Sequence, residues 1–317
     1  MTQRDVILRE AGLRDGLQNV HAFFATEAKK AWISAEAAAG VAEIEVCSFV
    51  PEKLIPQFKD AAEIVAHSLQ IPDLVVSALI PNLKGAQRGF ELGVHQLNYV
   101  CSVSESHNLR NVKRLPKDSV EDFRHIVKLR DSNPAWKPIK LKFGLATAFG
   151  CTIEGNVDPK AVMVMAEEAL AAGADAISLA DTVGYANPAQ IKALCLQAIK
   201  AFPGVEIGIH LHDTRGLGLA NAAAALDAGI RRLDGTLGGL GGCPYAPGAT
   251  GNVVFEDMAF MCEAMGLRTG IDLEKLVQVR DIVRAGLPAE EPLHGALARA
   301  GVPKGYAPAA GFAQAAE

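Results

Sequence analysis

The sequence lacks several features that mark whole classes of protein. No apolar run approaches the roughly 18 residues that span a bilayer, and the first residues, MTQRDVILREAG, mix charges where a secretion signal would be apolar. Its six cysteines include no CxxC pair, which argues against a disulfide scaffold and a zinc knuckle. Basic residues (31) are fewer than acidic ones (36), so the charge balance does not favour nucleic acid. We therefore expect a cytoplasmic protein with reduced thiols and neither membrane nor nucleic-acid partners.

The composition is that of a folded chain with a large core. Half of the 317 residues are hydrophobic and 21% are charged, which excludes a disordered or low-complexity protein. The length fits one α/β barrel of about 250 residues with an appendage, and it also fits two mid-sized domains.

Short β-rich runs alternate along the chain with Ala-rich amphipathic stretches. The runs predict eight strands, at 5–11, 43–49, 74–80, 96–102, 141–149, 176–182, 206–212 and 231–237. The amphipathic stretches predict helices at 26–39, 57–69, 83–92, 119–130, 159–172, 188–201 and 215–228, with further helical segments at 255–265 and 272–285.

Strands that alternate with helices indicate parallel βαβ units, and eight such units favour a closed (β/α)8 TIM barrel. An open doubly wound sheet is the alternative. The segment after the first strand, GLRDGLQN, argues against it because it is not the GxGxxG turn of a dinucleotide fold. We expect a TIM-barrel catalytic domain at 1–270 and a C-terminal helical extension at 271–317 that packs on the barrel.

Polar side chains collect where these predicted strands end, which is where TIM barrels place their chemistry. The sharpest feature is His210 and His212, since residues i and i+2 of a strand point to the same face. Such a pair can bind a metal or form a polar pair, and Asp15 and Asp213 favour a metal. Nitrogen and oxygen ligands suit Mg²⁺, Mn²⁺, Co²⁺ or Zn²⁺.

A glycine-rich loop, GLGGCPYAPGATGN (239–252), follows the eighth predicted strand. It is either a flexible surface turn or a functional loop. Cys243 lies in its middle, and a cysteine in a mobile loop at a barrel mouth can donate or accept a proton.

Six segments carry a recognisable pattern: LREAGLRDGLQN (8–19), IEVCSFVPEKLIPQ (44–57), LIPNLKG (79–85), ISLADTVG (177–184), HLHDTRGLGLAN (210–221) and GLGGCPYAPGATGNVVFEDM (239–258). They resemble the 3-hydroxy-3-methylglutaryl-CoA lyase family, within the metal-dependent barrel superfamily that includes isopropylmalate and homocitrate synthases. The HxHDTxGxxxAN pattern marks the superfamily, and GLGGCPYAxGAxGN separates the lyases from the synthases.

The resemblance implies divalent-metal-dependent retro-Claisen cleavage of 3-hydroxy-3-methylglutaryl-CoA to acetyl-CoA and acetoacetate, with Mg²⁺ or Mn²⁺. It also implies an acyl-CoA substrate and a homodimer or higher homo-oligomer. The implied metal ligands are Asp15, His210, His212 and Asn252.

The same resemblance implies catalytic roles for four residues. Arg14 would stabilise the enolate and Cys243 would protonate it. Glu45 and Asp181 match acidic residues that orient groups or relay protons, with weaker matches at Ser48 and Thr182. The base that takes the hydroxyl proton stays open between His210, Asp181 and a metal-bound water.

Two segments depart from the family pattern, GCTIEG (150–155) and PLHGALARAGVPKGY (292–306). We expect them where a CoA arm or acyl group could be bound, so another 3-hydroxyacyl-CoA, such as citramalyl-CoA, is an alternative substrate.

An aldolase or Claisen synthase is the nearest alternative class of enzyme, and the Cys243 loop argues against it. A biotin-linked carboxyltransferase would need a lysine beside the histidine pair; Lys140 and Lys142 start strand five and suit a structural role better. A non-catalytic binding module would leave these residues without a purpose.

Overall fold

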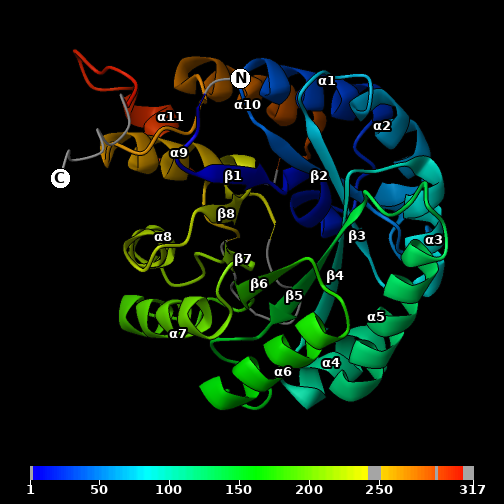
Figure 1. The fold of residues 1–317 in the computed structure, drawn as a ribbon. Coiled ribbons are helices and arrows are strands. Elements are labelled where there is room, and N and C mark those ends of the chain that lie inside the picture. Colours follow the sequence, from blue (N-terminus) through cyan, green and yellow to red (C-terminus); the bar gives the residue numbers. More distant parts are fainter. Residues whose placement is uncertain (1–2, 242–250, 290–291, 310–317) are drawn as a thin grey trace.

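Eight parallel strands close into a barrel, in which each strand pairs with the next and the last pairs with the first (Figure 1). The computed structural model describes residues 3–241, 251–289 and 292–309. The strands are β1 (Ile7–Glu10), β2 (Glu43–Ser48), β3 (Val75–Ile80), β4 (Gln96–Ser102), β5 (Lys140–Ala146), β6 (Ala176–Asp181), β7 (Glu206–Leu211) and β8 (Arg232–Gly235). The structure is therefore the TIM barrel that the alternating pattern predicts.

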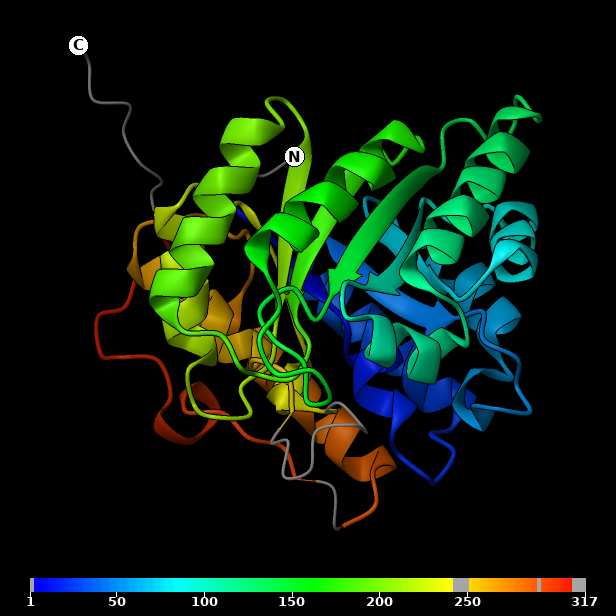
Figure 2. The same ribbon diagram turned by 90° about the horizontal axis from the view of Figure 1, so that it is seen from below.

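Helices surround this barrel on its outside (Figure 2). They are α1 (Thr26–Ala38), α2 (Ala61–Ser68), α3 (Leu83–Leu92), α4 (Glu105–Val112), α5 (Pro116–Asp131), α6 (Pro159–Ala171), α7 (Pro188–Ala201), α8 (Gly218–Asp227), α9 (Phe255–Ala264), α10 (Leu273–Gly286) and α11 (Leu297–Ala300). Three short turns, η1 (Gly12–Gly16), η2 (Pro56–Phe58) and η3 (Leu237–Gly239), interrupt the loops. Several helices begin at a residue whose side chain caps the helix N-terminus. In α7, Asn187 and Gln190 form a capping box, and Pro188 is the first helical residue.

The eight strand predictions are confirmed, and the helix predictions need three corrections. Helix α11 was not predicted, because it is a single turn of four residues. Helix α4 was not predicted, because its sequence ESHNLRNV buries only His107 and Asn108 and so has no apolar stripe. The predicted helix 57–69 is two pieces, η2 and α2. Strand β5 also ends before the predicted residue 149, since Thr147 has a φ of 57°, which breaks the extended backbone.

Successive residues of each strand face either the helices or the barrel interior. Outward-facing residues such as Leu8, Ile44 and Leu233 are apolar and buried against the helices. The interior instead holds charged side chains below the carboxyl ends of the strands. The Nε of Arg9, for example, donates to Oδ1 of Asp234 at 3.0 Å. Because each buried charge has opposite charges beside it, this polar interior is tolerated, and it leaves a charged floor beneath the strands' carboxyl ends.

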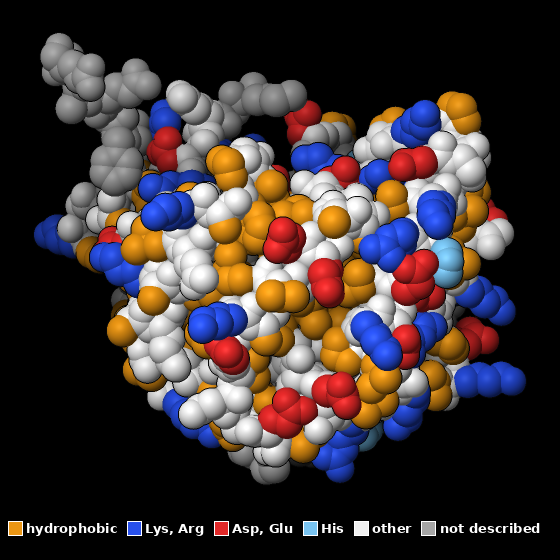
Figure 3. All heavy atoms as spheres, turned by 60° about the horizontal axis from the view of Figure 1, so that its bottom comes forward, with side chains coloured by type: hydrophobic (Ala, Val, Ile, Leu, Met, Phe, Trp, Pro, Cys, Tyr) orange, Lys and Arg blue, Asp and Glu red, His pale blue; other side chains and the backbone are white. Residues whose placement is uncertain are grey.

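Helix α10 lies beside α1 at the top of Figure 1 and also packs against α9. Its buried residues, Leu273, Leu276, Val279 and Val283, recur at helical spacing and form one apolar stripe. The division of the chain at residue 270 stays a prediction. Among the described residues, no helix is long and apolar enough to cross a membrane. On the face shown in Figure 3, acidic and basic side chains are interspersed among apolar ones.

Candidate active site

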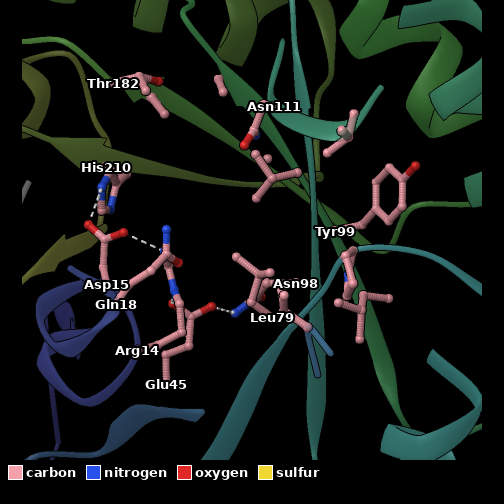
Figure 4. Close-up of a pocket in the computed structure, with 18 of the residues that line it drawn as sticks. Arg14, Asp15, Gln18, Glu45, Leu79, Asn98, Tyr99, Asn111, Thr182 and His210 are labelled. Atoms are coloured by element: carbon pink, nitrogen blue, oxygen red, sulfur yellow. Dashed lines mark hydrogen bonds and ion pairs between the residues drawn. The ribbon is translucent and has the colours of Figure 1, made fainter. Parts of the chain in front are cut away.

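A cavity of about 640 Å³ opens at the carboxyl ends of the strands. Residues of all eight strands line it, together with residues of α4 and of the loops after β1, β2 and β3. Figure 4 shows Asp15 and His210 facing each other at one side, with Arg14 and Glu45 beside them and Asn98 farther across. The cavity therefore lies where barrel enzymes place their chemistry.

Asp15, His210 and His212 form a cluster that could hold a metal ion, with one ligand atom from each lying within 4.8 Å of the others. The two histidine Nε2 atoms are 3.0 Å apart, and each lies 3.7 Å from Oδ2 of Asp15. The histidines thus point to one side, as their i, i+2 spacing predicts. Two imidazole nitrogens and a carboxylate oxygen are a ligand set that divalent transition ions accept.

Asn252 lies against this cluster, because residues 212 and 252 form a short antiparallel bridge. Its Nδ2 donates to Oδ2 of Asp15 at 2.7 Å and to the Leu240 carbonyl at 3.3 Å. Its Oδ1 is buried and has no hydrogen-bond partner among the described residues. A buried unpaired amide oxygen beside three metal-type ligand atoms fits a fourth ligand to a cation.

The charges around Asp15 keep it ionised. Burial works against the carboxylate, but Arg14, the two histidines and the Asn252 amide hold the Asp15 pKa well below its usual range. Burial, together with His210, lowers the pKa of His212 to about 4. Near neutral pH the cluster therefore offers an anionic oxygen and a neutral His212 imidazole, the forms that bind metals.

Arg14 reaches the same site from the residue before Asp15. Both lie in η1, a single π-type turn in which the amides of residues 14, 15 and 16 all donate to the Ala11 carbonyl. The Nη1 of Arg14 donates to Asp15 and its Nε donates to Oε2 of Glu45, both at 2.5 Å. Such π turns frequently occur at functional sites, and this one directs two neighbouring side chains into one cavity.

Glu45 holds Arg14 from the floor of the cavity. Its Oε1 also accepts from Nδ2 of Asn98 at 2.6 Å, and the side chain is fully buried. Burial raises the pKa of Glu45, but Arg14 and Arg9 outweigh that effect and lower it. Glu45 is therefore a fixed anion that orients the guanidinium.

Asp234 is a site residue that the sequence reasoning missed. Its Oδ2 lies 3.5 Å from Nδ1 of His210, on the opposite side of the ring from Asp15. Arg9 holds the same carboxylate with its Nε and Nη2. A carboxylate behind a metal-binding histidine fixes the ring and its tautomer. An available signal was the aspartate at the centre of the predicted strand 231–237, RRLDGTL.

The other predicted residues differ in placement. Asp181 follows the outward direction of β6: its oxygens accept from the amides of Tyr185 and Ala186 at 2.8 and 3.1 Å, and it does not line the cavity. Burial raises its pKa to about 6. Thr182 lines the cavity, whereas Ser48 accepts from the Val50 amide. Cys243 lies outside the described residues.

No described residue of the two departing segments, 150–155 and 292–306, lines the cavity. Their expected contact with a CoA arm or acyl group stays a prediction. Of the two lysines of β5, Lys140 is exposed and Lys142 is buried on the cavity floor. His107 lies in the first turn of α4 and lines the cavity. The five described cysteines are free and buried.

The fold and the cluster together define a (β/α)8-barrel protein with a carboxylate–histidine site at its mouth. The HMGL-like family model matches residues 5–283, and the chain belongs to that family. It is 38% identical over 274 residues to a hydroxymethylglutaryl-CoA lyase of Bacillus subtilis, covering 86% of this chain and 90% of that one. It is 37% identical over 309 residues to an (R)-citramalyl-CoA lyase of Chloroflexus aurantiacus, covering 93% and 95%.

Solved structures agree with this membership. An HMG-CoA lyase from A. baumannii, in complex with coenzyme A and 3-methylmalate, has a TM-score of 0.88 and 37% identity over 97% of this chain and 99% of that one. The HMG-CoA lyase of Bacillus subtilis has a TM-score of 0.87 and 35% identity, covering 94% and 98%. A carboxyl transferase domain of Rhizobium etli pyruvate carboxylase, at 18% identity and a TM-score of 0.65 over 93% of this chain and 50% of that one, shares the fold.

Proposed function

We propose that this protein is a carbon–carbon lyase that cleaves 3-hydroxy-3-methylglutaryl-CoA to acetyl-CoA and acetoacetate. The observation that carries the proposal is the convergence of Arg14 with the Asp15, His210 and His212 cluster in one cavity. The lyase names of the relatives at 35–38% identity support the same reaction.

The reaction is a retro-Claisen step. The C3 hydroxyl loses its proton, the C2–C3 bond breaks, and its electron pair passes to the thioester as an enolate. A divalent cation, when bound, lowers the pKa of that hydroxyl. Asp15, His210 and His212 would hold the cation, with Asn252 as a fourth ligand, and oxygen and nitrogen donors without a thiolate favour Mg²⁺ or Mn²⁺.

Arg14 stabilises the enolate oxygen with its fixed positive charge. Glu45 and Asp15 hold the guanidinium in place before the reaction, so little reorganisation is needed when charge develops. Cys243 then delivers a proton to C2, which completes acetyl-CoA. Asp181 faces away from the cavity and is poorly placed to take the hydroxyl proton, which leaves His210 and a water as candidates.

Citramalyl-CoA is the second candidate substrate, and its cleavage by the same steps gives acetyl-CoA and pyruvate. The observation that favours it is the extent of the match to the Chloroflexus aurantiacus lyase, which covers 93% of this chain, against 86% for the Bacillus subtilis lyase. The homo-oligomer and the cytoplasmic location stay predictions.

The test is a cleavage assay on chelated protein, with Mg²⁺ or Mn²⁺ added back and the CoA products separated by chromatography. We expect metal-dependent acetyl-CoA release, faster from 3-hydroxy-3-methylglutaryl-CoA than from citramalyl-CoA. Cys243→Ser should abolish release, whereas Cys195→Ser, in α7 and outside the cavity lining, should retain it. Cleavage of citramalyl-CoA alone would show that citramalyl-CoA is the substrate instead. Cleavage of neither compound by folded, metal-loaded protein would refute the proposal.

A further inference from the structure

The departing tail segment has a place in the fold that its sequence did not suggest. Residues 293–295 lie against η3 and α9, beside the two described ends of the glycine-rich loop. We call these ends, 237–241 and 251–252, the loop stem. The stem matters to the site because Asn252 belongs to it.

Glu256 and Arg280 connect the stem to the tail. Oε2 of Glu256, in the first turn of α9, accepts from the Gly238 amide at 3.0 Å. Its Oε1 is paired with Nη1 of Arg280, from α10. Glu256 is fully buried and Arg280 is largely so, and a buried charge-assisted bond of this kind fixes geometry more firmly than an exposed one.

Arg280 also binds the tail's main chain. Its Nη1 donates to the His294 carbonyl at 2.6 Å and its Nη2 to the Leu293 carbonyl at 3.2 Å. The His294 amide in turn donates to the Gly238 carbonyl at 2.7 Å. Gly295 has a φ of +131°, and a Cβ there would lie 3.2 Å from both Arg280 and Glu256, so glycine allows the tail to approach the pair.

The stem is packed from its other side by η1. A Cβ on Gly241 would lie 2.6 Å from the Asp15 carbonyl, and one on Gly251 would lie 1.9 Å from the Gly239 carbonyl. The Asn252 amide donates to both Asp15 and the Leu240 carbonyl. A shift of the stem would therefore move Asn252 relative to Asp15.

We propose that Arg280 and Glu256, with residues 293–295, form a clamp that positions the loop stem and so holds Asn252 against the metal cluster. Arg280 and Glu256 do not line the cavity, so they are positioning residues. The tail is thus part of the support of the active site. The kinetic readout rests on the proposed function, whereas the readouts of exchange and metal binding do not.

The test compares Arg280→Met with Arg280→Lys and with a matched control, Arg268→Met. Arg268 forms an ion pair with Asp5 just before β1, and within the described segments its side chain makes no hydrogen bond or ion pair with the stem or tail. Amide hydrogen exchange is measured for peptides covering 237–241, 292–297 and helix α8, with the Mn²⁺ dissociation constant, kcat and KM of each variant.

We expect Arg280→Met to speed exchange at 237–241 and 292–297 by at least about tenfold, with α8 unchanged. The Mn²⁺ dissociation constant should rise about tenfold, and kcat should fall about tenfold with KM changed less than about twofold, because the geometry at the reacting atoms is disturbed. Arg280→Lys keeps the charge but loses the planar pair of donors, so it should restore part of each effect.

Unchanged exchange at 237–241 in Arg280→Met would overturn the clamp, and so would an equal change in Arg268→Met. If Arg280→Met loosens the whole molecule, Arg280→Lys decides: exchange that rises only at the stem and tail supports the clamp, and uniform exchange overturns it. A wild-type protein that cleaves no acyl-CoA refutes the proposed function, while exchange and Mn²⁺ binding still decide the clamp.

Discussion

Arg9 and Glu10 are neighbours on β1, yet they face two opposite environments. Arg9 points into the barrel, where it pairs with Asp234 and lies 3.7 Å from Glu45. Glu10 points outward to the helices, where its Oε1 accepts hydrogen bonds from two main-chain amides and its buried Oε2 has no hydrogen-bond partner in the described part of the chain. Buried carboxyl groups at the inner face of the strand thus lie beside a cation, whereas Glu10 on the outer face is held by main-chain amides.

On the inner face, each carboxylate has a cation beside it. Despite burial, Arg9 and Lys142 keep the pKa of Asp234 well below its ordinary value, and Arg14 does the same for Asp15. On the outer face, among the described residues, no ion pair joins a cation to Glu10 or Glu36. Burial there raises the pKa of Glu10 to about 8 and that of Glu36 well above the ordinary value. Carboxyl groups that are equally buried are therefore ionised inside the barrel and protonated on its outer face near neutral pH.

The largest expected effect comes from removing a cation on the inner face. Arg14→Gln takes away the charge that faces the enolate, so kcat should fall by about 10²–10³-fold, as for other donors to a developing oxyanion. Steady-state kinetics on the acyl-CoA substrate measures it, and Arg124→Gln, on the exposed face of α5, is the control. A loss of less than about fivefold would contradict the role of Arg14.

A smaller effect should come from Asp234, which acts through His210. Asp234→Asn keeps the shape but removes the anion behind the imidazole, so the Mn²⁺ dissociation constant should rise about 10–100-fold. Isothermal titration calorimetry measures this directly. Unchanged affinity would show that the 3.5 Å contact does not orient the ring.

The smallest effect should come from the outer face. Glu10 and Glu36 have folded pKa values above those of the unfolded chain, so the folded protein binds more protons between pH 4.5 and about 8. The stabilisation they provide is complete below pH 4.5 and is lost as pH rises through that window. Glu36→Gln removes the need for that proton, so it should raise the free energy of unfolding at pH 8 and change it little at pH 4.5.

Denaturant unfolding of Glu36→Gln at the two pH values measures this difference. The exposed Glu167→Gln in α6 serves as the control and should show no such pH dependence. Lower stability of Glu36→Gln at pH 8 would mean that the outer carboxyls are ionised after all.

The fold could be predicted from sequence because it depends on local periodicity. Eight apolar runs of strand length alternate with amphipathic stretches, and each βαβ unit has its own pattern. The polar helix α4 has no such stripe and was missed.

The site was predictable where its residues share a short motif, as His210 and His212 do. The partnerships of Asp234 with His210 and of Arg280 with Glu256 and the tail were not, because they join residues far apart in sequence. The outward direction of Asp181 depends on the phase of β6, which a motif does not give.

The most direct test of the site is Mn²⁺ binding, followed by electron paramagnetic resonance as the ion is titrated into chelated protein. Wild-type protein should bind a single ion, and Asp15→Asn should bind it at least about 100-fold more weakly, because it removes the carboxylate from the ligand set. Equal binding by the two proteins would contradict a metal held by Asp15, His210 and His212, and with it the mechanism proposed for this barrel.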